Sequence, residues 1–373
     1  MLSRRVQLHK GERMTFSSIA HLEPLPGDSR LVQALREKLQ GFPPVYFSMV
    51  MATGIVSIAA YLQGLTRLAA GMMWLNAVLY VLFWLLLFAR LVISPKPLLR
   101  DLTNFRLAPS FFTIVAGTSV LARELLIIHA ESRVAAGMLW IAFPLWAVFI
   151  YVIFTAFTVK EAKPSLAEGI HGGWLLSVVA TQAVSILTAL VARRSANDQA
   201  MLFTALVLWL CGGMLYIWII SLIFYRYTFF KFVPSDLMPP YWINMGAMAI
   251  STLAGATLIQ SAPFAAFLEP MLPFLKGFTI LFWATATWWI PMLVILGFWR
   301  HVYKKFALKY DPLYWGLVFP LGMYSVCTHQ LLQVLHLSFL QWLPWAFAYI
   351  AIAAWLMTFI GLVMQLPRIL RTI

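Results

Sequence analysis

Ten long apolar segments dominate this 373-residue sequence and restrict the folds that are open to it. A helix needs about 20 mostly apolar residues to cross a bilayer. In lipid, only helices and closed barrels satisfy all of their own backbone polar groups. We therefore expect an all-α integral membrane protein whose ten transmembrane helices fill residues 44–366, at residues 44–62, 72–93, 109–129, 138–158, 170–192, 202–225, 240–261, 275–299, 313–335 and 343–365.

The charges of the chain are few and unevenly placed. Apolar residues make up 62% of the sequence and charged residues 11%, with a net charge of +14. If the N-terminus is cytoplasmic, the cytoplasmic segments hold 21 Lys and Arg residues and the other side holds six. Because basic residues accumulate on the cytoplasmic side, we expect both tails, residues 1–43 and 367–373, in the cytoplasm. The positive charge then needs no nucleic acid partner.

The N-terminal tail, residues 1–43, contains no apolar run that would act as a secretory signal. Within it, four apolar residues recur at helical spacing opposite a charged face: Leu31, Leu35, Leu39 and Phe42. This spacing predicts an amphipathic helix lying on the membrane surface. A solvated helical tail without such a role is the alternative.

A repeat of about 65 residues runs through the apolar segments. Its small-residue centres lie 63, 64, 67 and 74 residues apart, near Gly54, Gly117, Thr181, Met248 and Gly322. Each interval holds one odd-numbered and one even-numbered segment. We therefore expect five helical hairpins repeated along the chain.

The odd-numbered and even-numbered segments differ in side-chain size. Except in the last pair, the odd segments are rich in Gly, Ala, Ser and Thr, and the even ones are rich in Trp, Phe and Leu. We expect an inner ring of odd helices around a central pore, with even helices outside and aromatic residues such as Phe149 facing lipid. The alternative is that small residues only allow close helix packing.

Ionisable groups are scarce in the predicted spans. All 13 Asp and Glu residues lie in loops, tails or span ends, and the nearest to the membrane core is Glu124, beside Arg123 at an outer edge. Coupled carriers commonly place such groups in mid-membrane, so we expect passive permeation. His329 is a possible proton-sensitive residue, although an interhelical hydrogen bond would also explain it. His329 and His336 lack a third ligand, so neither a metal site nor a cofactor is expected.

Four segments resemble the tellurite-resistance/dicarboxylate transporter family. They are PPVYFSMVMATGIVS (43–57), PPYWINMGAMAIS (239–251), WWIPMLVILGFWRH (288–301) and YDPLYWGLVFPLGMYSVCT (310–328). The family includes bacterial TehA, the plant guard-cell slow anion channel, and the fungal malate permease and sulphite exporter. The resemblance implies a homotrimer, here in a bacterial inner membrane, in which each protomer has its own pore.

The resemblance also implies an uncharged pore that is closed midway by a phenylalanine of the ninth helix. The motif places this gate at Phe319, and Pro320 would loosen the helix there by removing a backbone hydrogen bond. The alternative is a core aromatic that packs over neighbouring glycines. Small and hydroxyl residues of the odd helices are then predicted to line the pore: Thr53, Ser57, Gly117, Thr118, Ser119, Ser177, Thr181, Ser185, Ala247, Ser251, Ala254, Gly322 and Ser325.

The predicted function is a passive anion channel or uniport-like transporter for small anions or C4-dicarboxylates, linked to tellurite resistance or sulphite efflux. With the inside negative, the membrane potential opposes anion entry by about 2.3 kcal/mol per charge at 100 mV, so efflux is the expected direction. Two alternatives stay open. One is a proton-coupled malate or C4-dicarboxylate carrier. The other is a membrane-embedded enzyme that uses His171, although we expect no enzymatic activity.

Overall fold

The computed structural model describes residue 39 and residues 41–194 and 199–371. Most of the predicted amphipathic segment of the tail falls outside these residues. Within them the chain forms helices and no strands. The expected all-α fold is therefore confirmed for the described part of the chain.

Five helices form the interior of the molecule. They are α2 (Phe47–Leu62), α5 (Phe112–Ile128), α8 (Leu176–Ala192), α10 (Ile243–Ser261) and α12 (Trp315–Leu335). Each packs against the next in this order, and α12 packs back against α2. The five helices thus close into a ring.

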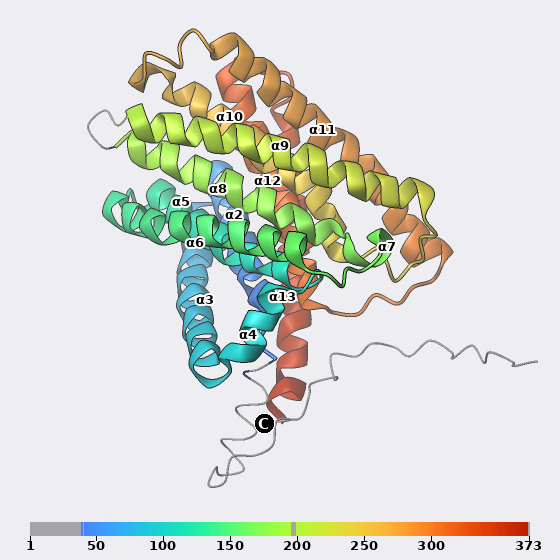
Figure 1. Ribbon diagram of the computed structural model, residues 1–373. Coiled ribbons are helices and arrows are strands. Elements are labelled where there is room, and N and C mark those ends of the chain that lie inside the picture. Colours follow the sequence, from blue (N-terminus) through green and yellow to red (C-terminus); the bar gives the residue numbers. More distant parts are fainter. Residues whose placement is uncertain (1–38, 40, 195–198, 372–373) are drawn as a thin grey trace, which may run out of the picture.

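Five longer helices surround the ring (Figure 1). They are α3 (Thr66–Ile93), α6 (Ser132–Val159), α9 (Gln199–Phe229), α11 (Leu272–Phe298) and α13 (Trp342–Arg371). Each packs against the inner helix that precedes it in the chain and also against the next one around the ring, so that α13 contacts both α12 and α2. An outer helix therefore covers each seam of the inner ring.

Nine of the described helical stretches are long and apolar enough to cross a membrane. In their most apolar windows, 78–94% of the residues are buried in the four inner stretches and 17–44% in the five outer ones. Helix α12 is not among the nine, because polar residues occupy its C-terminal half: Ser325, Thr328, His329, Gln330 and Gln333. The tenth crossing, by α12, stays a prediction.

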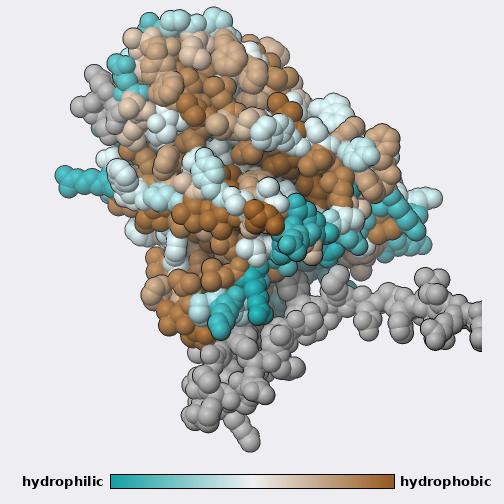
Figure 2. Space-filling model, in the orientation of Figure 1, coloured by the Kyte–Doolittle hydropathy of each residue, from teal (hydrophilic) through white to brown (hydrophobic). Residues whose placement is uncertain are grey.

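The surface of the bundle is suited to lipid. Figure 2 shows hydrophobic side chains over much of the visible face, with hydrophilic ones gathered in separate groups. Large exposed apolar residues come from outer helices, for example Phe88, Trp140, Trp218, Phe298 and Met357. Phe149 differs from its prediction, because it is only 9% exposed and packs edge-on against Phe111 and Phe112. This outer helix therefore turns part of its aromatic face inward.

Every inner helix begins with a short 3₁₀ turn. These turns are Pro44–Tyr46, Ala108–Phe111, Gly172–Leu175, Pro239–Trp242 and Pro312–Tyr314. Four carry proline at the first or second position, where the missing N–H is tolerated. In the fifth, a Cβ on Gly172 would come within 2.5 Å of the Pro240 carbonyl oxygen. The five turns contact one another in the same circular order as their helices, so all five N-termini meet at one end of the ring.

Aromatic side chains of the outer helices hold the inner helices by hydrogen bonds. Indole N–H groups of Trp146, Trp283 and Trp355 donate to the hydroxyls of Thr181, Thr328 and Thr53, over 2.8, 3.0 and 3.0 Å. Tyr80 shares a 3.0 Å hydrogen bond with Thr118, and Trp209 donates to the Ser251 carbonyl over 2.9 Å. Each inner helix therefore has at least one aromatic hydrogen-bond partner on the outer helix before it in the ring. The Trp355–Thr53 bond joins the last long helix to the first.

The Trp355–Thr53 bond provides a test of this fastening. Thr53→Val keeps the side-chain volume but leaves the partly buried indole N–H of Trp355 without its acceptor. Interhelical hydrogen bonds in membranes contribute about 0.6 kcal/mol on average and up to about 1.7 kcal/mol. We expect the free energy of unfolding, measured by reversible denaturation in mixed micelles, to fall by an amount in that range.

The matched control is Thr285→Val. The Thr285 hydroxyl donates only to Leu281 of its own helix, so its loss should leave the unfolding free energy nearly unchanged. Equal effects of the two substitutions would contradict a fastening role for Thr53.

Candidate functional site

A small cavity lies on the axis of the inner ring. All five inner helices line it, through Ile55, Ile58, Ser119, Val120, Arg123, Ala183, Ile186, Ile250, Leu253 and Met323. Its free volume is about 10 Å³, which is close to the minimum of about 10–15 Å³ that a single water molecule needs. The axis is therefore narrow and mostly apolar at this level.

Arg123 is the charged residue in the cavity wall. Its side chain is 6% exposed, and its Nε atom has no hydrogen-bond partner. The other two buried arginines of the described chain are paired, Arg90 with Asp101 at 2.5 Å and Arg226 with Asp236 at 3.5 Å. No described carboxylate pairs with Arg123 in this way. Its positive charge therefore faces the axis without a counter-ion from the described chain.

The sequence places Arg123 at an outer edge of its span, and the structure adds that its side chain lines the axial cavity. Helix α5 continues to Ile128, so Arg123 lies more than one turn inside the helix end. It follows Ser119 by four residues and Val120 by three, which places all three side chains on one helix face. The spacing of Ser119, Val120 and Arg123 is visible in the sequence. The sequence does not show, however, that this face of α5 points to the axis.

Glu124, the next residue, is fully buried on a different face of α5. Its Oε2 accepts a 2.7 Å hydrogen bond from Nδ2 of Asn76 on α3. A Cβ on Gly54 of α2 would come within 2.7 Å of Asn76 Nδ2 and 3.0 Å of Glu124 Oε2. Gly54 thus leaves room for this pair, and Glu124, which the sequence places at an outer span edge, is buried between helices.

The predicted pore hydroxyls are engaged in hydrogen bonds. Besides the aromatic partners of Thr53, Thr118 and Thr181, three serines donate to carbonyls of outer helices: Ser57 to Ala69, Ser185 to Ala205 and Ser325 to Pro344. Ser177 and Ser251 donate to carbonyls one turn earlier, and so does Ser119. Of these residues only Ser119 lines the axial cavity. A pore-lining role for the others stays a prediction.

The predicted small pore residues lie at helix contacts. A Cβ on Gly117 would come within 3.2 Å of the Phe47 carbonyl oxygen, and one on Gly322 within 3.0 Å of Ile55. Ala247 and Ala254 of α10 are fully buried. These positions let the inner helices approach one another closely.

Phe319 and Pro320 lie on α12 beside the axis. Phe319 is 1% exposed and precedes the cavity residue Met323 by four residues, so it shares the face of α12 that Met323 turns to the axis. It therefore lies one turn nearer to the ring of N-termini than the cavity does. Pro320 packs against Gly246 of α10, where a Cβ would approach Pro320 Cγ to 2.7 Å. The gate role of Phe319 stays a prediction.

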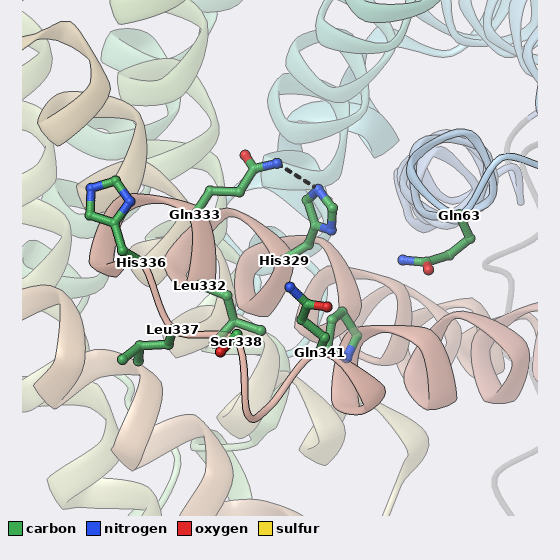
Figure 3. A pocket seen from close by; sticks show the side chains of 9 residues that line it. Gln63, His329, Leu332, Gln333, His336, Leu337, Ser338 and Gln341 are labelled. Carbon is green, nitrogen blue, oxygen red and sulfur yellow. Dashed lines mark hydrogen bonds between the residues drawn. The ribbon is translucent and has the colours of Figure 1, made fainter.

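His329 lies away from this cavity. It lines a separate pocket of about 540 Å³ where α12 turns into α13, together with polar residues that include Gln63, Gln333 and Gln341. Figure 3 shows His329 and Gln333 side by side on α12, with Gln63 reaching in from α2. Nε2 of His329 lies 3.0 Å from Nε2 of Gln333. The residue therefore has a hydrogen bond within α12 rather than the interhelical bond considered above.

His171, the candidate residue for an enzyme, has a local structural role. It lies just before the apolar stretch that begins at Gly172, and its Nδ1 accepts a 3.1 Å hydrogen bond from the Gly173 N–H. Burial, together with the charges of Arg106 and Arg226, lowers the pKa of His171 to about 4. The ring is therefore neutral near pH 7 and caps the turn that starts α8.

Comparison with known proteins gives a consistent picture. The family model described as voltage-dependent anion channel, SLAC1, matches residues 41–363. An uncharacterized transporter of Methanocaldococcus jannaschii is 24% identical over 88% of this chain and 96% of its own length. An uncharacterized membrane protein of Mycobacterium tuberculosis is 36% identical over 41% of this chain and 77% of its own length. A sulfite efflux pump of Trichophyton rubrum is 26% identical over 86% of this chain and 90% of its own length.

The gate prediction concerns Phe319. Truncation of a fully packed core phenylalanine costs about 3–5 kcal/mol, whereas a side chain that plugs an axial path has fewer packing partners. Phe319→Ala should therefore cost less stability than this and raise anion flux into proteoliposomes severalfold. Phe319→Leu should give an intermediate flux.

The control for Phe319 is an aromatic on the outside of the bundle. Phe88 is 64% exposed on α3, and Phe88→Ala should leave the flux unchanged. A folded Phe319→Ala protein with wild-type or lower flux would contradict the gate role and indicate that Phe319 only packs in the core.

Proposed function

Because the chain belongs to the voltage-dependent anion channel (SLAC1) family, we propose that it conducts small anions passively along the axis of its five inner helices. It is an integral membrane protein of an anion-transporting family. The observation that carries the proposed path is Arg123 in the wall of the axial cavity, where its guanidinium has no carboxylate partner among the described residues.

An unpaired positive charge among apolar walls would attract anions into the axis. Two opposite unit charges about 4 Å apart attract by about 4 kcal/mol at an effective dielectric constant of about 20. The ring of five N-termini adds to this attraction at one end of the path, since each helix start carries a partial charge of roughly +0.5. Both features repel cations.

The other walls of the cavity would keep the ion from being trapped. Apart from Ser119 and Arg123 they are apolar, including Ile186, Leu253 and Met323. A permeant ion must bind well enough to enter and weakly enough to leave. One charged group among apolar walls meets that requirement better than a full shell of hydrogen-bond donors.

The narrow axis favours small transported ions over large ones. A free volume of about 10 Å³ corresponds to a closed path that must widen for any anion to pass. A small inorganic anion needs less widening than a C4-dicarboxylate. The sulfite efflux pumps among the relatives support the same preference, so we place sulfite-like anions ahead of dicarboxylates as substrates.

The cellular setting completes the proposal. We infer a homotrimer in a bacterial inner membrane, as the family resemblance implies. The distribution of Lys and Arg predicts that both termini lie in the cytoplasm. The ring of N-termini would then face the cytoplasm. A negative interior favours anion efflux through a passive path, and a link to tellurite resistance would act through such efflux.

Substitution of Arg123 tests the proposed function. Arg123→Gln removes the axial charge, and since 1.4 kcal/mol corresponds to a factor of ten, we expect voltage-driven anion flux in proteoliposomes to fall at least tenfold. Arg123→Lys keeps the charge and should retain most of the flux.

The matched control is Arg133→Gln at the exposed start of α6. It removes the same charge from the protein but not from the axis, so the flux should stay near the wild-type value. A folded Arg123→Gln protein with wild-type flux and anion selectivity would refute the path past this residue.

A proton-coupled carrier is the second candidate, because Glu124 is a buried acid next to the axial residue in sequence. It differs from the first candidate in what drives transport. If a potassium gradient with valinomycin drives flux without a pH gradient, and His329→Gln leaves that flux within a fewfold of wild type, transport is passive. A requirement for a pH gradient would favour the carrier.

A further inference from the structure

We propose that the carboxyl group of Glu124 binds a proton in the folded protein and forms a cyclic acid–amide pair with Asn76. Glu124 is the buried acidic residue of the described chain, with no exposed surface, and Asn76 is equally buried. The pair lies between α3 and α5 beside Gly54 of α2.

Two oxygen atoms of this pair have no hydrogen-bond partner. Asn76 Nδ2 donates to Glu124 Oε2 over 2.7 Å. The remaining oxygen of each side chain, Oε1 of Glu124 and Oδ1 of Asn76, is buried without a partner. Buried polar atoms are nearly always hydrogen-bonded. These two oxygens are therefore expected to have a donor that the ionised form of the pair does not provide.

A single proton supplies that donor. An ionised carboxylate offers only acceptors, whereas a protonated carboxyl has one O–H donor. With a proton on Oε1, the acid can donate to Asn76 Oδ1 while Oε2 accepts from Asn76 Nδ2. The two side chains then satisfy each other through two hydrogen bonds, and no buried oxygen needs another partner.

Among the described residues, no cation pairs with Glu124 to stabilise its ionised form. Arg123 and Glu124 are consecutive, and consecutive residues of a helix do not face each other. No ion pair joins them in the described chain, and Arg123 turns to the axial cavity. A buried charge without a partner is strongly disfavoured in an apolar interior.

Other ionisable groups of the neighbouring helices are directed elsewhere. On α3, Arg67 is exposed, Tyr80 bonds to Thr118, and Arg90 pairs with Asp101. His129 at the end of α5 is exposed and lies against Trp74. On α2, Tyr61 is partly exposed near the helix end. Ser57 donates to the Ala69 carbonyl, and its hydroxyl also lies beside the Glu124 carboxyl. On the other neighbours, Arg133 of α6 is exposed, and α8 carries no ionisable residue between Leu176 and Ala192.

The protonated state has a consequence for the axis. A neutral Glu124 leaves the positive charge of Arg123 uncompensated by its sequence neighbour. This consequence rests on the proposed anion path, whereas the protonation itself does not depend on what the protein transports.

Infrared spectroscopy of the protein in lipid tests the protonation directly. At pH 6 a carboxyl group in water is ionised, so a carbonyl band of a protonated carboxyl identifies a retained proton. We expect this band in the wild type and its loss in Glu124→Gln, whose amide can form the same two hydrogen bonds with Asn76. Asn76→Ala should keep the band but shift its frequency, because the acid loses its amide partner.

The matched control is Asp101→Asn, which removes a carboxylate paired with Arg90 and should leave the band unchanged. The proposal is wrong if the wild type lacks the band at pH 6, or if Glu124→Gln and Asn76→Ala both leave it unaltered. If Glu124→Gln does not fold, the presence of the band in the wild type and its shift in Asn76→Ala still test whether Glu124 is protonated. Because none of these measurements involves transport, they remain valid if the anion path is refuted.

Discussion

Hydrogen bonds from outer-helix aromatics to inner helices hold the ring closed, and the chemistry of the axis depends on them. Lipid tails are as apolar as the helices, so association within a membrane relies on close packing and polar contacts rather than on the hydrophobic effect. Trp355 and Thr53 provide such a contact between the first and last long helices, and Trp146 and Thr181 provide another. The hydroxyls used in these bonds point away from the axis, which leaves its wall largely apolar.

Helix α5 separates two ionisable groups that are neighbours in sequence. Arg123 faces the cavity and Glu124 faces Asn76 on α3. A rotation of about 100° between consecutive residues is enough to place one group on the axis and the other in the packing between helices. The two groups therefore do not pair with each other in the described chain, and Arg123 is the charged residue in the cavity wall.

Much of the architecture was predictable from the sequence. The predicted limits of α2, residues 44–62, coincide with the 3₁₀ turn and helix found at Pro44–Leu62, because length and apolarity define a span. The outer helices are longer than predicted, as with α9 at Gln199–Phe229, since their ends mix polar and apolar residues. The prolines at the starts of four inner helices also carry information in the sequence, because a proline is tolerated in the first turn of a helix.

The axis itself was not predictable. Small residues such as Gly117 and Gly322 mark where inner helices contact one another. These contact faces differ from the helix faces that line the axial cavity. The sequence placed Arg123 at an outer edge of its span, but it did not reveal that neighbouring helices bury this side chain in the wall of the cavity. Locating the axis requires the closed ring of inner helices, which depends on the contact between α2 and α12, segments far apart in the sequence.

In this account, anions pass through the cavity lined by Arg123 and Ile186. They do not pass along the helix faces whose hydroxyls bond to the outer helices, such as that of Ser185. The direct measurement places single cysteines at Ile186 and at the adjacent Ser185, in a protein without Cys211 and Cys327, and follows anion flux during treatment with an anionic thiol reagent. Ile186 lines the cavity and Ser185 bonds to Ala205 of α9. Modification at position 186 should block the flux, and modification at position 185 should not. Block at position 185 alone would contradict the assigned path.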